Sequence, residues 1–492
     1  MDSKKYILAI DQSTAGTKAV IFDRRGELIY KCSREHQQYY PKQGWVEHDA
    51  EELLFHTRML IANALKESEI GAEELACIAL TNQRETALIW DKYTGKPVYR
   101  AIVWQCNRGT EICARLTAEP EVPEKIKRIT GLPLSEYFSA AKLAWIVENV
   151  EGVKELMSQN KLLCGTIDSW LVWNLSAEKA HVTDYTNASR TQLFDLEKKT
   201  WNDWLINKFG LKVSMFPKIV SSDDIVGHML LDNILVPIAG LVGDSQGALF
   251  AQTGLGEGIK VTYGTGSSIM YKIGNQPCYS DNLAVSVACA CLGEICYGLE
   301  GNVNSTGATL KWLVEKARFT KNVEDIEKLA AAVQDNGGVY LVPAFSGLGA
   351  PYWSGNAKAV LYGMNFGTTK EHIARAAIES IAYQIHDVID CMEKETGVSA
   401  VRIRADGKPT ENQFLMQFQA DVLGKTVTVS KVQEASAFGA ALLAGLAVGF
   451  WNKEEISGLI KDSVSYFPLE KWEKVKNYCQ EWKQSVQASI GK

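Results

Sequence analysis

The chain of 492 residues is long enough for two or three domains, and its 46% hydrophobic and 22% charged residues exclude a disordered or fibrous protein. Lys and Arg number 52 against 58 Asp and Glu, for a net charge of −6, which argues against nucleic acid or an anionic membrane surface as a partner. The longest nearly apolar stretch, Ile234–Val242, is less than half of what a membrane span needs. Residues 1–14 do not fit a signal peptide, so we expect a cytoplasmic protein.

The cysteine and histidine patterns predict neither disulfides nor a zinc site. There are eleven cysteines and no C-x-x-C motif, and the closest pair is Cys289 and Cys291. In a chain of this length we expect reduced thiols in the core, with this pair on one face if the segment is a strand. The seven histidines show no spacing typical of metal ligands.

The first half of the chain predicts an α/β domain with mixed strand pairing. Tyr6–Asp23 reads as two apolar strands around a small-residue turn at Ser13–Thr17. A third strand follows, then a helix with apolar residues at helical spacing, then a buried strand that ends in polar residues. These three elements are expected at Glu27–Cys32, Glu51–Glu67 and Leu75–Leu80.

A second copy of this pattern begins at Gly258. The strands are expected at Gly258–Tyr263, Ser268–Ile273 and Val401–Ala405, and the helices at Thr369–Thr396, Phe414–Leu423 and Ser436–Phe450. We therefore predict two domains of similar architecture, residues 1–250 and 251–492, although their residues show no obvious repeat.

Two small-residue turns after strands are candidate phosphate sites. Asp11–Lys18 combines a carboxylate, hydroxyls and glycine, a set that can hold phosphate and Mg²⁺. Gly264-Thr265-Gly266 opens the second half in the same way. Either could be an ordinary hairpin turn, and the Gly-Thr-Gly tripeptide is weak evidence by itself, but finding both at matching positions favours phosphate binding. The chain has neither a P-loop nor a strand-linked dinucleotide motif.

Three further features could serve phosphoryl transfer to a hydroxyl. Asp244 follows an apolar run and could accept the hydroxyl proton, or it could only cap a helix starting at Gln246. Arg84 and Glu85 could hold vicinal hydroxyls, or form a surface ion pair. Trp104 and Tyr137 could form the wall of a sugar pocket, or simply be core aromatics.

Taken together, the segments resemble the FGGY carbohydrate kinases, and within that family they are similar to the glycerol kinases. The resemblance covers nearly the whole chain. It rests on Gly44–Asp49 (GWVEHD), Thr81–Thr86 (TNQRET), Ala101–Cys106 (AIVWQC), Val182–Thr191 (VTDYTNASRT), Gly337–Tyr340 (GGVY), Val342–Phe345 (VPAF), Gly347–Trp353 (GLGAPYW) and Phe414–Gln419 (FLMQFQ).

This resemblance implies two RNase H-like domains of the actin/hexokinase type around a cleft for ATP, Mg²⁺ and a polyol, with glycerol as the expected acceptor. Asp244 matches the catalytic base and Asp11 the carboxylate associated with Mg²⁺. The polyol-binding positions are Arg84, Glu85, Trp104, Tyr137, Asp244, Ser245 and Ser268; the nucleotide-binding positions are Thr14, Ala15, Lys18, Thr265, Gly307, Lys311, Lys408 and Asn412. A homodimer or homotetramer is expected on the same ground.

The chain also departs from the glycerol kinase pattern. Ser245 and Ser268 stand where those kinases have Gln and Phe, which suggests a larger or more polar acceptor such as a tetritol, a pentitol or a ketose (erythritol, xylitol, xylulose, ribulose). Lys311 and Lys408 stand where they have Gln and Gly, which would alter the phosphate donor unless both side chains point to solvent. A non-catalytic sugar or nucleotide sensor and an actin-like ATPase are the remaining alternatives, although Asp11 and Asp244 argue against the first.

Overall fold

The computed structural model describes residues 4–400, 402–470 and 472–491, and a six-stranded sheet forms the core of their first half. Side by side, its strands are β13 (Ile225–Leu231), β14 (Ile234–Gly243), β5 (Leu75–Asn82), β1 (Tyr6–Gln12), β2 (Gly16–Asp23) and β3 (Leu28–Glu35). β1 pairs antiparallel with β2 and parallel with β5, and β5 pairs parallel with β14. β1 and β5 are apolar on both faces because helices cover the sheet on each side.

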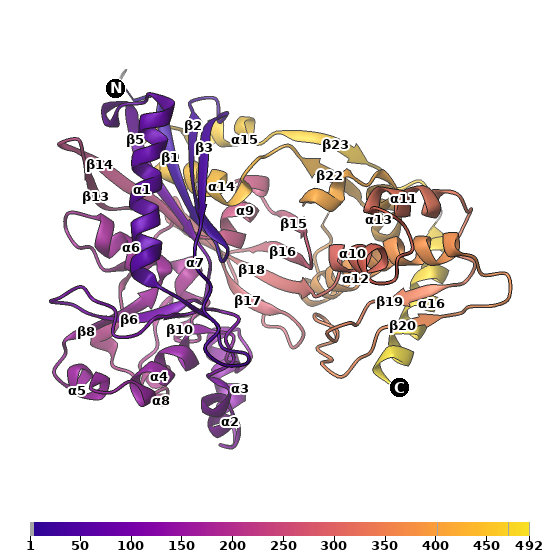
Figure 1. Ribbon diagram of the computed structural model, residues 1–492, viewed down its shortest axis with the longest axis horizontal. Helices are drawn as coiled ribbons and strands as arrows, with labels where there is room; N and C mark the ends of the chain where they lie inside the picture. The colour runs from indigo at the N-terminus through magenta and orange to yellow at the C-terminus, as the bar shows by residue number, and fades with distance from the viewer. Residues whose placement is uncertain (1–3, 401, 471, 492) are drawn as a thin grey trace.

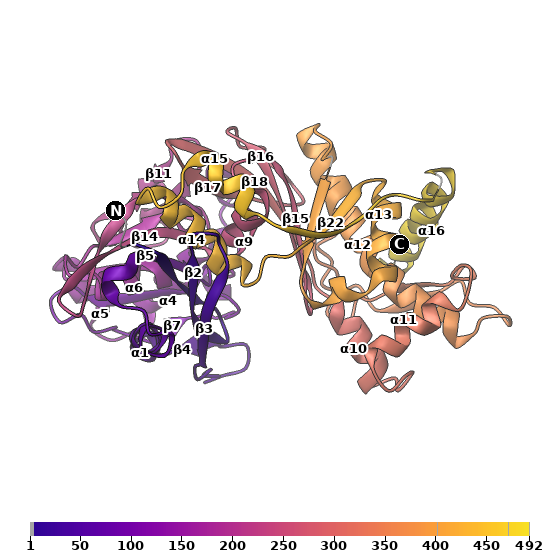
Figure 2. The same ribbon diagram turned by 90° about the horizontal axis from the view of Figure 1, so that it is seen from above.

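The helices on the two faces come from distant parts of the sequence. On one face lie α1 (Ala50–Ser68) and α6 (Ile167–Leu175). On the other lies α14 (Ala435–Ala447), which packs against β1, β5 and β14 and against α9 (Asp244–Thr253). Figures 1 and 2 show the yellow α14 beside the indigo strands. α14 belongs by sequence to the second predicted domain but packs in the core of the first sheet. The division at residue 250 stays a prediction.

A seven-stranded sheet forms the core of the second half. Its strands, side by side, are β17 (Ala284–Cys291), β18 (Glu294–Val303), β16 (Ser267–Gly274), β15 (Gly258–Tyr263), β21 (Arg402–Asp406), β22 (Thr426–Ser430) and β23 (Asp462–Tyr466). The helices of this half are α10 (Gly307–Glu315), α11 (Val323–Ala331), α12 (Lys370–Thr396), α13 (Gln413–Leu423) and α16 (Trp472–Ile490). Figure 1 places these helices at the right, the first sheet at the left, and β15 to β18 between them.

The two sheets share one strand order. β3, β2 and β1 are antiparallel and are followed by parallel β5 and β14; β18, β16 and β15 are antiparallel and are followed by parallel β21 and β22. The predicted similarity of the two halves is therefore confirmed. The turn after β1 and the turn after β15 occupy equivalent places, as do the ends of β5 and β21.

Smaller elements complete the fold. A four-stranded sheet of β4 (Glu47–His48), β7 (Ala101–Ile102), β6 (Ala87–Asp91) and β8 (Leu162–Thr166) packs with α2 (Thr110–Thr117), α3 (Val122–Thr130), α4 (Ser139–Asn149), α5 (Val153–Ser158) and α8 (Asp203–Lys208). The remaining pieces are β9 (Val182–Asp184), β10 (Phe194–Asp195), β11 (Thr200–Trp201), β12 (Lys218–Val220), β19 (Tyr340–Val342), β20 (Val360–Tyr362), α7 (Tyr185–Ala188), α15 (Lys453–Leu459) and the 3₁₀ turns η1 (Ala72–Glu74), η2 (Val213–Met215) and η3 (Lys408–Glu411).

The predicted elements are confirmed, with ends that differ by a few residues. Among the helices, α14 ends at Ala447 rather than Phe450. All eleven cysteines are free, and the Sγ atoms of Cys289 and Cys291 on β17 lie 3.4 Å apart. No helix among the described residues is long and apolar enough to cross a bilayer.

Candidate active site

A cavity of about 680 Å³ opens between the two sheets and draws its lining from both halves of the chain. The first half contributes Thr14, Arg84, Glu85, Trp104, Tyr137, Arg190, Asp244 and Ser245; the second contributes Gly264, Gly266, Ser268, Glu300, Asn302 and Asn304. All seven predicted acceptor-binding residues therefore line one cavity. The structure brings them together although they lie as far apart as positions 84 and 268.

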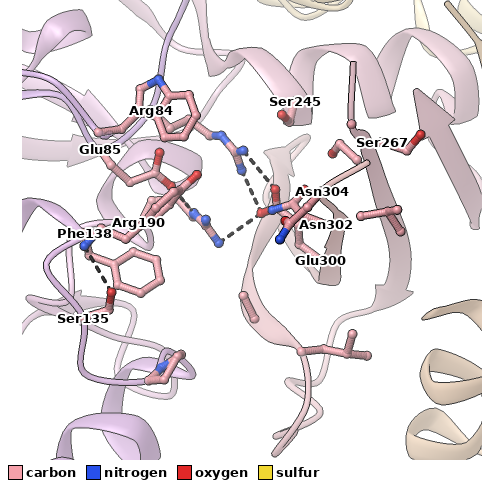
Figure 3. A pocket seen from close by; sticks show the side chains of 18 of the residues that line it. Arg84, Glu85, Ser135, Phe138, Arg190, Ser245, Ser267, Glu300, Asn302 and Asn304 are labelled. Atoms are coloured by element: carbon pink, nitrogen blue, oxygen red, sulfur yellow. Dashed lines mark hydrogen bonds and ion pairs between the residues drawn. The ribbon is translucent and has the colours of Figure 1, made fainter. Parts of the chain in front are cut away.

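Glu300 is the centre of a buried group of charges in this cavity (Figure 3). Its carboxylate accepts two hydrogen bonds from Arg84, each 2.9 Å long, and lies 3.0 Å from Nη1 of Arg190. The Nε atom of Arg190 donates to Glu85 at 2.5 Å. Burial by itself would raise the pKa of Glu300, but the guanidinium groups of Arg190 and Arg84 hold it well below its usual range. Glu300 is thus ionised and holds both arginines in place without a ligand.

Arg84 and Glu85 do not pair with each other. Each bonds to a residue far away in the sequence, and the side chains of both are less than a tenth exposed. The alternative of a surface ion pair is therefore wrong. Glu85 has a left-handed backbone with φ of 61°, an unfavourable conformation for a residue with a Cβ. Such strain is commonly kept at functional sites, where it aims a side chain.

Asp244 lies where β14 ends and α9 begins. Its Oδ1 lies 3.2 Å from Nε of Arg84, and its side chain stays 32% exposed. Gly243 is the N-cap of α9 and Asp244 is its first helical residue, so the expectation of a helix that starts at Gln246 is wrong. Asp244 and its neighbour Ser245 line both this cavity and a second one beside it. A carboxylate in that place can contact two ligands at once.

Aromatic side chains form one wall of the large cavity. Trp104 and Tyr137 meet edge to face with ring centroids 5.5 Å apart. The indole Nε1 of Trp104 donates to Oγ1 of Thr14 at 2.9 Å, which ties this wall to the first turn. Lys142 is buried and donates to the carbonyl oxygens of residues 136 to 138, so it fixes the loop that carries Tyr137.

The second cavity, of about 370 Å³, is lined by several charged residues, and Asp11 and Lys18 are the two that the sequence analysis expects near the phosphates. Asp11, Lys18, Asp244, Lys260 and Asp406 line it, together with Ser268. Burial raises the pKa of Asp11 to about 7, and the nearby Asp244 carboxylate adds to this rise against the opposing effect of Lys18. Oδ1 of Asp11 is buried without a hydrogen-bond partner among the described residues. An unshared carboxylate oxygen of this kind fits the ligand preference of Mg²⁺.

The predicted nucleotide positions fall into two groups. Thr14 lines the large cavity and Lys18 the second one, while Ala15 is exposed in the turn between them. The backbone N–H of Gly307 donates to Gly264 O at 2.9 Å, which places the start of α10 against the second turn and Thr265.

Lys311, Lys408 and Asn412 are not among the residues that line either cavity. Lys311 is exposed and pairs with Glu315 at 3.6 Å, and Lys408 is exposed on η3. The exposure of both lysines agrees with the alternative in which they face solvent. Asn412 caps α13 by accepting a hydrogen bond from the backbone N–H of Leu415 at 2.7 Å.

The residues of this site that sequence analysis missed include Arg190, Lys260, Glu300, Asn302 and Asn304. Glu300 and Lys260 did carry a signal, because each is a charged residue inside an otherwise apolar strand. A charge on such a strand is buried and has to find a partner. Asn302 lies two residues after Glu300 on β18 and so shares its face, and Asn304 follows just after the strand ends.

The comparisons with known proteins agree with this architecture. A model of the N-terminal domain of the FGGY family of carbohydrate kinases matches residues 6–251, and a model of its C-terminal domain matches residues 259–448. The chain belongs to the FGGY family of carbohydrate kinases. The resemblance seen in the sequence is confirmed, as is the α/β fold with two RNase H-like halves, and the protein is an enzyme of the kinase class.

Among relatives of this FGGY kinase, the glycerol kinase of Clostridium beijerinckii is 44% identical over 494 residues, covering 99% of each chain. Glycerol kinase 1 of Thermotoga maritima is 45% identical over 98% of this chain and 99% of its own. The crystal structure of Plasmodium falciparum glycerol kinase with ADP superimposes with a TM-score of 0.94 at 33% identity over 98% of both chains. A xylulose kinase from Lactobacillus acidophilus shares the fold, with a TM-score of 0.86 at 22% identity.

Proposed function

We propose that this FGGY kinase transfers the γ-phosphoryl group of ATP to a terminal hydroxyl of a small polyol, with glycerol giving glycerol 3-phosphate. The observation that carries the proposal is the position of Asp244, which lines both cavities at their junction. The full-length similarity to glycerol kinases supports ATP as donor and glycerol as acceptor.

Each side of the junction has a separate task in this scheme. The acceptor lies in the large cavity, where Arg84 and Glu85 bind its far hydroxyls and Trp104 packs on its carbon chain. The phosphates lie in the second cavity and along the two small-residue turns, where backbone N–H groups and Lys18 offset their charge. Both reactants are thus held in line before the reaction, which lowers its entropic cost.

Asp244 acts as the general base. Its partly exposed carboxylate accepts the proton of the terminal hydroxyl as that oxygen attacks the γ-phosphorus, and Arg84 at 3.2 Å orients the carboxylate. Asp11 would hold Mg²⁺, which offsets the charge of the phosphates when bound. Assembly as a homodimer or homotetramer remains a prediction.

The experiment is a coupled assay of ADP release with ATP and Mg²⁺, with and without glycerol. We expect glycerol-dependent turnover. Asp244→Asn should lower kcat about 10²-fold to 10⁴-fold, the usual contribution of a general base, while calorimetry still detects glycerol binding. An unchanged kcat would overturn the role of Asp244. ADP release that needs no acceptor would instead favour an ATPase, and binding without turnover would favour a sensor.

A further inference from the structure

One strand of the large cavity carries polar side chains that the proposed reaction on glycerol does not use. β18 contributes Glu300 and Asn302, and Asn304 follows just after it. Side chains two residues apart on a strand point the same way, and Figure 3 shows the labelled side chains of these three residues together in the pocket. Glu300 is fully engaged with the two arginines. Among the described residues, neither asparagine side chain forms a hydrogen bond with the protein.

A third polar group lies beside Asn302 on the neighbouring strand. β16 pairs antiparallel with β18, and the register places Ser268 opposite Asn302. Directly opposed residues of an antiparallel pair have Cβ atoms about 5 Å apart on the same face. The Ser268 hydroxyl is buried and has no hydrogen-bond partner among the described residues. A buried hydroxyl without a partner is costly, which points to a ligand that completes its bonding.

The chemistry of the row formed by Asn302, Asn304 and Ser268 indicates which kind of ligand it can bind. An amide offers two donors and an acceptor, and a serine hydroxyl offers one donor and can accept. None of the three groups carries a charge, so they match hydroxyl groups, which also donate and accept, rather than a carboxylate or a phosphate. Adjacent hydroxyls on a carbon chain can each reach a different member of the row.

The cavity also has room for a chain longer than glycerol. A water molecule occupies about 30 Å³ in the liquid, and glycerol fills the space of roughly four waters, about 120 Å³. The cavity measures about 680 Å³. Glycerol held at Arg84 and Asp244 therefore leaves the side of Asn302 and Asn304 open.

We propose that Asn302, Asn304 and Ser268 form a subsite for hydroxyl groups beyond the first three carbons, so that the acceptors of this kinase include an uncharged linear polyol of four or five carbons. The proposal rests on the proposed function for the phosphoryl transfer, but the subsite itself is a binding site and can be tested without turnover.

The test measures both binding and turnover for glycerol, erythritol and xylitol. Wild type should bind erythritol or xylitol at least as tightly as glycerol by calorimetry, and should phosphorylate it with a kcat/KM no lower than that for glycerol. Asn302→Ala should weaken binding of the longer polyol about fivefold to tenfold, as expected for a lost neutral hydrogen bond, and change glycerol binding less than twofold. The main-chain oxygen of Asn302 accepts from Ala350 N at 3.1 Å, a bond that alanine keeps.

Asn149→Ala is the matched control, because this exposed asparagine lies on α4 outside the cavity and its side chain bonds, among the residues that the structure describes, only to Trp145 O at 2.9 Å. This variant should change the binding of neither glycerol nor the longer polyol. Asn304→Ala provides a second variant of the subsite if Asn302→Ala fails to fold.

The outcomes separate the subsite from the proposed function. If wild type binds and phosphorylates glycerol alone, or if Asn302→Ala weakens both polyols equally, the subsite is wrong and the kinase assignment stands. If the longer polyol binds through Asn302 and neither polyol is phosphorylated, the subsite stands and the proposed function fails. A preference for xylulose or ribulose over both polyols would reassign the subsite to a ketose and overturn the linear polyol as its ligand.

Discussion

Asp11 is a carboxylate that β1 carries into a buried place. It lies opposite Lys18 in the β1–β2 register, and Lys18 shares its charge with Glu434 at 2.6 Å. Burial therefore dominates, and the pKa of Asp11 rises to about 7. The strand keeps an ionisable group where an apolar one would be more stable, and this cost agrees with the proposed role of Asp11 in holding Mg²⁺.

Replacing Asp11 by Asn should stabilise the protein in a pH-dependent way. The folded protein binds more protons than the unfolded chain between the unfolded pKa near 3.8 and the folded pKa of about 7. Its free energy of unfolding therefore falls as pH rises through that window and levels off above it. Urea unfolding without Mg²⁺ or nucleotide measures the effect. The free energy of unfolding of Asp11→Asn should be higher than that of wild type by up to about 4 kcal/mol at pH 8 and by clearly less at pH 5.

Asp91→Asn is the control with the opposite sign. Backbone N–H groups of Thr94 and Tyr93 lower the pKa of Asp91 by bonding to its carboxylate. Its replacement should therefore destabilise the protein at pH 8, and less so at low pH. If Asp11→Asn shifts stability by the same amount at both pH values, Asp11 is not a buried acid with a raised pKa.

At the scale of elements, the contact between α9 and α14 joins Asp244, the proposed general base, to the first sheet. The two helices approach so closely that a Cβ at Gly439 would overlap the carbonyl oxygen of Gly247, and one at Gly247 would lie 2.8 Å from Ser436 O. Only glycine at both positions allows this approach. Because α9 begins at Asp244, the crossing also fixes the direction of that side chain.

Gly439→Ala should therefore push α9 and α14 apart. We expect a loss of about 1–3 kcal/mol in the free energy of unfolding, as for other overpacked cores, together with a lower kcat because Asp244 moves. Gly458→Ala is the matched control on α15, where a Cβ meets nothing within 4 Å. It should be neutral or stabilise the protein by up to about 1 kcal/mol. Equal effects of the two alanines in thermal unfolding would contradict the close contact.

The elements themselves could largely be predicted from the sequence, because periodicity and turn residues are local signals. The residues at which the helices and strands begin and end were less predictable. β5 continues to Asn82, past the predicted Leu80, because Asn82 pairs with Gln12 on one side and Gly243 on the other. Those partners come from distant strands, and no local pattern reveals them.

The site was predictable only where a residue acts from a turn or a strand end. Asp11, Arg84 and Asp244 all stand at such places. The partner of Arg84 is 216 positions away in the sequence, and its identity depends on how the two sheets face each other. Glu300 and Arg190 therefore remained hidden until the fold was known, although the charge in an apolar strand was visible.

At the scale of the whole molecule, the two halves are joined through the charges at Glu300. β18 belongs to the second sheet, whereas Arg84 follows β5 of the first sheet and Arg190 follows α7. The two arginines thus bond across the cavity to one carboxylate that is 1% exposed. A buried charge that loses its partner is far more costly than an exposed one, so the stability of the assembled cleft depends on this residue.

Glu300→Gln should destabilise the protein by about 3–5 kcal/mol, because it leaves two buried guanidinium groups short of negative charge. Urea unfolding measures this loss, and acceptor binding should weaken with it because Arg84 is no longer held. Glu315→Gln is the matched control: its partner Lys311 lies 3.6 Å away and both side chains are more than half exposed, so its effect should stay within about 0.5 kcal/mol. If both variants unfold at the wild-type urea concentration, the charges at Glu300 do not hold the two halves together, and the packing of α9 against α14 must do so instead.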